Sequence, residues 1–274
     1  PFNPETVYAL LAMLISFFVL LASARKENSD EGISFNFTNF TRGDQGVTLL
    51  GQANIMANGI LALTNHTNPT WNTGRALYSK PVPIWDSATG NVASFVTSFS
   101  FVVKEIKGGI PADGIVFFLA PEARIPDNSA GGQLGIVNAN KAYNPFVGVE
   151  FDTYSNNWDP KSAHIGIDAS SLISLRTVKW NKVSGSLVKV SIIYDSLSKT
   201  LSVVVTHENG QISTIAQVVD LKAVLGEKVR VGFTAATTTG RYVELYDIHA
   251  WSFTSTLVTA TSSTSKNMNI ASAA

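Results

Sequence analysis

Residues 149–164 read VEFDTYSNNWDPKSAH, a short strand followed by a polar turn and the start of a second strand. Glu150 and Asp152 stand two positions apart in the strand, so both side chains point to the same face. The polar residues that follow favour a turn, which brings Asp159 and His164 back toward the two carboxylates. Three carboxylates that converge on one point repel one another and are costly to desolvate, so bound cations would relieve the cluster.

The ligand types in this stretch predict two kinds of cation site. Carboxylate oxygens with one imidazole suit Mn²⁺ or a similar transition ion, and this set consists of Glu150, Asp152, Asp159 and His164. Oxygen donors alone suit Ca²⁺, and this set consists of Asp152, Asp159, the Asn156 side chain and the main-chain carbonyl of Tyr154. Asp152 and Asp159 can bridge both ions. On spacing alone, the alternative is a solvated acidic turn with a surface histidine.

Short apolar runs separated by turn residues continue on both sides of this stretch, from about Ile33 onward. Residues 93–103 alternate with period two, and residues 114–120 are apolar on both faces, which is typical of a strand buried between layers. Residues 187–194 and 201–207 are two β-branched runs joined by a short polar connection. The pattern predicts one all-β domain, a sandwich or a barrel.

The composition agrees with a single globular domain and excludes several kinds of site. The chain has 274 residues, of which 45% are hydrophobic, enough for a sizeable core. Lys+Arg and Asp+Glu are both 20, and no basic stripe or RNA-binding motif is found, which argues against nucleic acid as a partner. The zero formal net charge favours self-association, because mutual repulsion is weak. Cysteine is absent, which excludes disulfides, zinc–thiolate sites and cysteine nucleophiles.

The N-terminal segment predicts export. Residues 7–22 form an almost unbroken apolar run that ends in Ala22-Ser23-Ala24. An apolar core before a small-x-small motif is typical of a secretory signal peptide, here residues 1–24 with an incomplete n-region. We therefore expect a protein of the secretory pathway, extracellular or vacuolar, with no membrane span in the mature chain. A single membrane anchor is the alternative.

Two further features fit an exported protein. N-glycosylation sequons, each with a threonine two residues later, begin at Asn36, Asn39 and Asn65. The C-terminal residues 258–274 are rich in Ser, Thr, Ala and Asn, and we expect them to form a disordered tail.

The sequence resembles the legume lectin family, the secreted plant lectins of the L-type. Residues 149–168 match the metal-loop signature of that family nearly position for position, and similar segments lie at 93–101, 111–121, 131–135 and 251–253. The resemblance extends over roughly residues 33–256, within an expected lectin domain at 25–257. It implies an antiparallel jelly-roll β-sandwich, the concanavalin-like lectin fold, in a calcium- and manganese-dependent lectin that binds carbohydrate without catalysis.

The resemblance also implies roles for single residues. The two metal sets would be those given above, and Ser174 would hold a water on Mn²⁺. Asp113 would accept bonds from sugar hydroxyls after a cis Ala112–Asp113 peptide, and Gly132 would donate its main-chain N–H where a side chain would obstruct. Asn156 would donate its side-chain amide, and Tyr154 would cover the apolar side of the sugar ring. A fourth loop near residues 236–240 would complete the site.

The family resemblance implies partners and an assembly as well. The partners would be mono- or oligosaccharides and glycoproteins, and the length of residues 233–251 favours a galactose-type sugar over mannose or glucose. Family members form homodimers or homotetramers, usually through the flat sheet away from the sugar. Phe35 and Phe37 should face inward, so a glycan on Asn36 would project from that sheet and crowd the usual dimer contact.

Three alternatives are weighed against a sugar-binding lectin and its residue roles. One is a lectin-like storage or defence protein with lost or altered sugar binding. Another is a jelly-roll glycoside hydrolase, in which a Glu-x-Asp-x-Glu strand supplies both catalytic carboxylates. Glu150 and Asp152 match the first half of that motif, but no glutamate follows. The third alternative concerns single residues that would have no ligand role. In it, Trp158 packs beneath the metal loop and Asp168 forms hydrogen bonds at a strand end. His66, His207 and His249 have no matching partners and are surface or packing residues.

Overall fold

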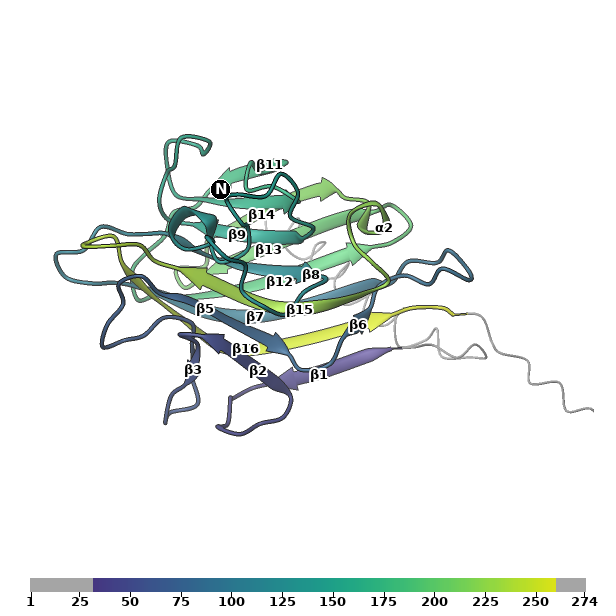
Figure 1. Ribbon diagram of the computed structural model, residues 1–274, viewed down its shortest axis with the longest axis horizontal. Helices are drawn as coiled ribbons and strands as arrows, with labels where there is room; N and C mark the ends of the chain where they lie inside the picture. Colours follow the sequence, from purple (N-terminus) through teal and green to yellow (C-terminus); the bar gives the residue numbers. More distant parts are fainter. Residues whose placement is uncertain (1–31, 260–274) are drawn as a thin grey trace, which may run out of the picture.

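The computed structural model describes residues 32–259, and their strands form two antiparallel β-sheets (Figure 1). The expected signal peptide, residues 1–24, and nearly all of the expected tail, residues 258–274, lie outside the described residues. Between residues 32 and 259, no helical segment has the length and apolar character needed to span a bilayer.

One eight-stranded sheet contains the two longest strands within residues 32–259. Its order is β14 (Ile212–Val218), β13 (Thr200–His207), β12 (Leu187–Asp195), β7 (Ser94–Glu105), β16 (Glu244–Thr256), β4 (Leu61–Ala62) and β3 (Asn54–Ile55). The eighth strand, β1 (Ile33–Phe37), also pairs with β16, next to its C-terminal half. The two ends of the described chain therefore lie side by side (Figure 1).

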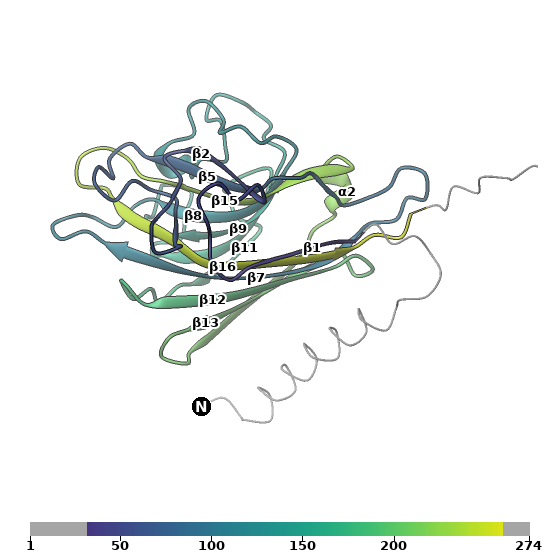
Figure 2. The ribbon, with the colours of Figure 1, turned by 90° about the horizontal axis from the view of Figure 1, so that it is seen from below.

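The second eight-stranded sheet holds the strands that carry the acidic residues. Its order is β11 (Arg176–Lys179), β10 (His164–Ala169), β9 (Val147–Asp152), β8 (Gly114–Ala120), β15 (Lys228–Ala236), β5 (Thr73–Tyr78) and β2 (Val47–Gly51), and β6 (Val82–Pro83) pairs with β15. Two short helical turns lie outside the sheets, η1 (Gly131–Gln133) and α2 (Leu221–Val224). Figure 2 shows the two sheets as separate layers. The antiparallel β-sandwich expected from the sequence is confirmed.

Aromatic side chains fill the space between the two sheets. In β7 the buried positions alternate with less buried ones, as its period-two pattern predicts, and Phe99 points into the core. The ring of Phe99 contacts Phe233 of the other sheet edge to face, with centroids 4.9 Å apart. Phe233 in turn lies 5.0 Å from Trp251. Full burial of each such ring contributes roughly 1.5–3 kcal/mol, so this cluster is a main source of the stability of the sandwich.

β8 is buried on both faces, as its continuous apolar run predicts. Ile115, Phe117 and Leu119 face the sandwich core. Val116 and Phe118 face the opposite way, into a second apolar cluster with Leu134, Ile136, Phe146 and Leu172. Because the last four residues lie in the connections outside the strands, this second cluster anchors the loop layer to the outer face of the sheet.

Candidate functional site

The pairing of β9 with β10 brings the predicted acidic residues and the histidine together. Asp152 lies opposite His164, and Glu150 lies opposite Gly166, so all of these positions share one face of the sheet. The potential ligand atoms of Glu150, Asp152 and His164 all lie within 4.8 Å of one another, and the three side chains are buried. Nε2 of His164 is 2.9 Å from Oε1 of Glu150.

Gly166 makes room for one more member of this cluster. Ser174, from the connection between β10 and β11, donates a hydrogen bond of 2.6 Å from Oγ to Oε1 of Glu150. A Cβ atom on Gly166 would lie 2.2 Å from that Oγ and 2.5 Å from that Oε1. A side chain at position 166 would therefore push Ser174 and Glu150 apart.

The cluster has too little positive charge for its carboxylates. Burial, and then the charges of Glu150 and Asp159, raise the pKa of Asp152 to about 9. Burial lowers the pKa of His164, but the hydrogen bond and charge of Glu150 outweigh that effect and raise it overall. The Asp152 carboxyl thus resists ionisation beside its neighbours, and a bound cation would remove this conflict.

Asp168 belongs to the same buried surface. It lies two residues beyond Gly166 on β10, so its side chain is on the face that carries Glu150. Burial and then the charge of Glu150 raise the pKa of Asp168 well above its ordinary value. The register therefore places Asp168 behind the cluster, near the end of β10, and its predicted hydrogen-bonding role at the strand end stays a prediction.

Asp159 stands beside the three clustered residues. It lies in the turn after β9, outside the group of ligand atoms within 4.8 Å, and its Oδ2 accepts a hydrogen bond of 2.7 Å from the N–H of Asn156. Asp159 nevertheless contributes to the raised pKa of both Asp152 and His164 through its charge. The structure thus brings three of the four predicted manganese ligands into contact and holds the fourth within the same electrostatic neighbourhood.

A second set of polar groups gathers at the adjoining loops. Asp113 follows a cis Ala112–Asp113 peptide immediately before β8, and its main-chain oxygen accepts a 3.0 Å hydrogen bond from the N–H of Thr153. Oδ2 of Asp113 and Oδ1 of Asn156 are buried and have no hydrogen-bond partner within residues 32–259. Unpaired buried oxygens are costly, so these atoms mark a place where a polar ligand would be accommodated.

Glycines let the other loops approach these oxygens. A Cβ atom on Gly132 would lie 2.7 Å from Nδ2 of Asn156, so position 132 has no space for a side chain. The equivalent atom on Gly131 would lie 3.4 Å from Cβ of Thr238 and 3.8 Å from Oδ2 of Asp113. Loops that are far apart in sequence therefore meet around one small polar surface.

The aromatic side of this surface includes a residue that sequence reasoning missed. Tyr154 is half-buried, and its ring meets Tyr242 edge to face at 5.4 Å. Tyr242 lies in the connection from β15 to β16, the predicted fourth loop, and its N–H contacts the main-chain oxygen of Thr239. In the sequence, the position of Tyr242 two residues after Gly240, in the predicted fourth loop, could have indicated that it belongs to the site.

Comparison with known proteins identifies the family. A sequence model described as legume lectin domain matches residues 32–269. The chain belongs to the legume lectin family. A Robinia pseudoacacia sequence named as a bark agglutinin, LECRPA3, is 98% identical over 272 residues, 99% of each chain. The galactose-binding lectin of Arachis hypogaea is 52% identical and covers 95% of this chain and 98% of its own.

Solved structures agree with the family and with the fold. The seed lectin of Lotus tetragonolobus superposes with a TM-score of 0.80 at 55% identity, over 83% of this chain and 100% of its own. A peanut lectin structure also reaches a TM-score of 0.80, at 52% identity over 84% of this chain and 100% of its own. The relatives are lectins, which are carbohydrate-binding and non-catalytic, so the predicted class of function is confirmed and the hydrolase alternative falls away.

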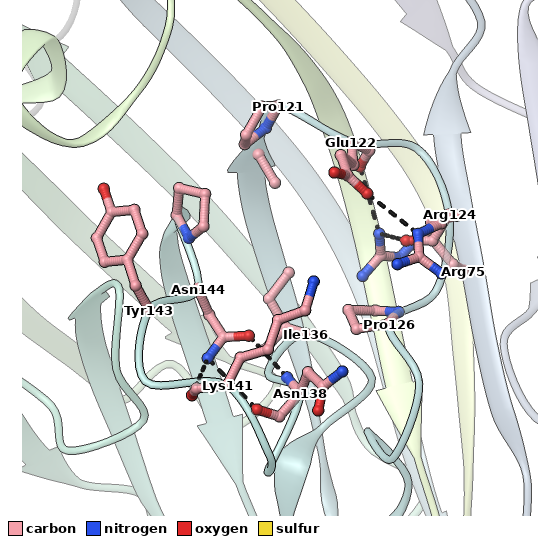
Figure 3. Close-up of a pocket in the computed structure, with 12 residues that line it drawn as sticks. Arg75, Pro121, Glu122, Arg124, Pro126, Ile136, Asn138, Lys141, Tyr143 and Asn144 are labelled. Carbon is pink, nitrogen blue, oxygen red and sulfur yellow. Dashed lines mark hydrogen bonds and ion pairs between the residues drawn. The ribbon is translucent and has the colours of Figure 1, made fainter.

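Arg75 holds one loop of this lectin in place, and sequence reasoning missed it. Its Nη1 donates to the main-chain oxygen of Arg124 at 2.7 Å and of Ala123 at 3.2 Å, and its Nη2 donates to that of Gly135 at 2.6 Å. Figure 3 shows Arg75 beside Glu122 and Arg124 at one wall of a pocket. Burial lowers the pKa of Arg75 to about 9. The presence of an arginine inside the otherwise largely apolar strand β5 could have indicated this structural role in the sequence.

Two expectations for the remaining residues of the lectin are wrong. Trp158 does not pack beneath the metal loop, because 41% of its surface is exposed. It lines a shallow groove with Leu172 and Ile173. His66 and His207 both have partners: Nε2 of His66 lies 2.8 Å from Oδ1 of Asp247, and Nε2 of His207 lies 3.3 Å from Oγ of Ser213. The His66 contact joins segments that are distant in sequence, which the local sequence around the residue does not reveal.

Proposed function

We propose that this lectin binds a galactose-type sugar in a site held in shape by Ca²⁺ and Mn²⁺. The observation that carries the proposal is the pair of buried, unpartnered oxygens beside the glycines of the second loop, Oδ2 of Asp113 for a sugar hydroxyl and Oδ1 of Asn156 for Ca²⁺. A carboxylate accepts bonds from sugar hydroxyls, while a side-chain amide and the N–H of Gly132 donate to them. Tyr154, with Tyr242 at its edge, supplies an apolar surface for the C–H side of the ring.

The residues of the acidic cluster fit the two ions. Glu150, Asp152, Asp159 and His164 combine carboxylate oxygens with one imidazole, which suits Mn²⁺, and Ser174 reaches Glu150 from the side. Asp152, Asp159, the Asn156 side chain and the Tyr154 carbonyl supply only oxygen, which suits Ca²⁺. When bound, the ions would neutralise the clustered carboxylates and fix the loop. Asn156 belongs to both sets of proposed contacts, so ordering the metal loop also orders the sugar contact.

The galactose assignment draws support from relatives and from the fourth loop. The Arachis hypogaea relative is named a galactose-binding lectin. A solved Ulex europaeus lectin, 42% identical to this chain, is described as complexed with galactose. β15 ends at Ala236 and β16 begins at Glu244, so the fourth loop consists of residues 237–243. The sequence-based preference for galactose rested on the length of the wider stretch 233–251.

The proposal includes a secreted, glycosylated and oligomeric protein. The signal-peptide pattern at residues 1–24 supports export, and an all-β domain without cysteine is compatible with it. The sequon residues Asn36 and Asn39 are exposed, whereas Asn65 is half-buried and its side chain accepts a hydrogen bond from Thr67. We infer glycans at the first two positions and assembly as a homodimer or homotetramer.

A glycan array read with and without the two ions tests the function. Galactose-terminated glycans should bind in Ca²⁺ and Mn²⁺, bind weakly after exhaustive chelation, and bind again when both ions return. Asp113→Asn keeps the shape of the side chain and removes its charge, so it should weaken binding by at least about tenfold. Full affinity without metal would contradict the metal coupling. No bound glycan in the presence of both ions would favour the storage or defence alternative.

A further inference from the structure

Two glutamates lie directly opposite each other at one end of the first sheet. Glu244 opens β16 and pairs in register with Glu105, at the end of β7. Like charges on opposite residues of neighbouring strands repel each other. Glu244 is also fully buried, whereas the side chain of Glu105 is partly exposed. The buried carboxylate therefore needs a cation of its own.

Lys182 supplies that cation from the connection between β11 and β12. Its Nζ lies 2.7 Å from Oε1 of Glu105 and forms a second ion pair with Oε1 of Glu244. Only 9% of the Lys182 side chain is exposed. A lysine enclosed in this way, with one fully buried partner, is strongly tied to its position because either charge alone would be left without compensation.

The remaining oxygen of Glu244 connects this ion pair to the sugar-site loop. The buried hydroxyl of Tyr246 donates to Oε2 of Glu244 at 3.0 Å, and it lies 3.4 Å from Oγ1 of Thr153. Thr153 donates from its N–H to the main-chain oxygen of Asp113 at 3.0 Å, and its hydroxyl lies 3.2 Å from the same oxygen. Because the Tyr246 proton goes to Glu244, the single Thr153 hydroxyl proton can close the contact to Tyr246 while the N–H holds Asp113. An unbroken series of polar contacts thus runs from Lys182 to the main chain of Asp113.

We propose that Lys182, Glu244, Tyr246 and Thr153 form a positioning relay that fixes Asp113 in the geometry required for sugar binding. The inference rests on the proposed function, because it assigns residues that support the proposed sugar contact. None of the four touches the sugar in this scheme, so they are positioning residues. The relay also places a charged pair behind Asp113, because the Glu244 carboxylate acts on the Asp113 carboxyl and Lys182 offsets part of that charge. An uncompensated Glu244 would repel the carboxylate that accepts the sugar hydroxyls.

Tyr246→Phe breaks the relay with the smallest change in shape. The variant should bind galactose about tenfold more weakly, the effect of losing one buried hydrogen-bond link. The amide of Thr153 should also exchange its hydrogen about tenfold faster, because its acceptor is held less firmly. Calorimetry with galactose and hydrogen-exchange mass spectrometry measure the two effects, both in saturating Ca²⁺ and Mn²⁺. Bound-metal content should stay as in the unmodified chain.

Charge variants separate positioning from general stability. Lys182→Met should lower galactose affinity by more than Tyr246→Phe, and the double variant Lys182→Met with Glu244→Gln should recover to within about threefold of the unmodified chain, because no lone buried charge remains. Lys199→Met is the matched control: it removes the exposed ion pair with Asp220, at 2.5 Å, and should leave galactose affinity unchanged. If Lys182→Met does not fold, the double variant and Tyr246→Phe still decide the question.

The two readouts keep the two proposals apart. If the unmodified chain does not bind galactose, the galactose assignment is wrong, and the exchange rate of the Thr153 amide still tests the relay. A Tyr246→Phe chain with unchanged exchange at Thr153 overturns the relay, whatever the sugar result. Equal loss of galactose affinity in Lys182→Met and Lys199→Met would also overturn it.

Discussion

Gly166 shows what one missing side chain does for the acidic cluster. Gly166→Ala would place a methyl group 2.2 Å from Oγ of Ser174 and 2.5 Å from Oε1 of Glu150, so both must shift. We expect manganese retention to fall by at least about tenfold, because the ligand geometry is disturbed and a supporting hydrogen bond is lost. Competition with a metal-sensitive chelating dye measures the change. Gly226→Ala is the control, since a Cβ atom at that glycine has no neighbour within 4 Å.

Single residues were predictable where their contacts follow from local spacing. Glu150 and Asp152 share a face because strand side chains alternate, and the turn to His164 follows from the polar residues between them. Arg75 and Lys182 could not be assigned in this way. Their partners lie 48 to 77 residues away in the sequence, so the contacts depend on the order of strands in each sheet. The same dependence explains the wrong expectation for His66, whose partner Asp247 is 181 residues distant.

Strand β1 is the element on which the proposed assembly of the molecule depends. Phe35 points inward and stacks on Tyr78 with ring centroids 4.2 Å apart, while Asn36 is exposed on the outer face of the sheet. A glycan at Asn36 would cover the outer face of this sheet, which is the surface proposed to pair with a second copy. Asn36→Gln removes this glycan and should therefore change the quaternary structure of the protein. The change would be measured as a different sedimentation coefficient. Asn39→Gln, which removes a sequon beyond β1, is the control. Identical sedimentation of glycosylated Asn36 and Asn36→Gln protein would count against this role.

Long elements were predictable and short ones were not. The alternation in β7 and the double-sided apolar run of β8 appear directly in the sequence and in the structure. β3, β4 and β6 have two residues each, too few for any periodic pattern. They form because a neighbouring strand offers unpaired main-chain groups, as β15 does for β6.

At the scale of the whole molecule, the acidic cluster should make stability depend on pH in an unusual direction. Burial and then the charge of Glu244 raise the pKa of Asp113 to about 7, and burial raises that of Asp152 to about 9. The metal-free folded chain therefore holds protons that the unfolded chain releases near pH 4. This contribution is fully present below that pH and is lost as the pH rises through 7 toward 9.

Thermal unfolding in a chelator tests the sign. The metal-free lectin should melt at least about 5 °C lower at pH 8.5 than at pH 5. The raised pKa of His164 acts in the same direction. The lowered pKa values of Asp195 and Asp220 act only at more acidic pH and do not affect this comparison. Saturating Ca²⁺ and Mn²⁺ should abolish the difference, because bound cations stabilise the ionised carboxylates. A metal-free chain that is more stable at pH 8.5 than at pH 5 would show that ionisation of the buried carboxylates does not destabilise the fold.

The two faces of β8 divide the molecule into a scaffold and a receptor. Ile115 and Phe117 belong to the packing between the sheets, whereas Val116 and Phe118 belong to the smaller cluster beneath the loops. Damage to neighbouring positions of one strand therefore has different results. Truncation on the inner face undermines the sandwich as a whole, while truncation on the outer face loosens the loops and leaves a folded body that has lost its recognition surface.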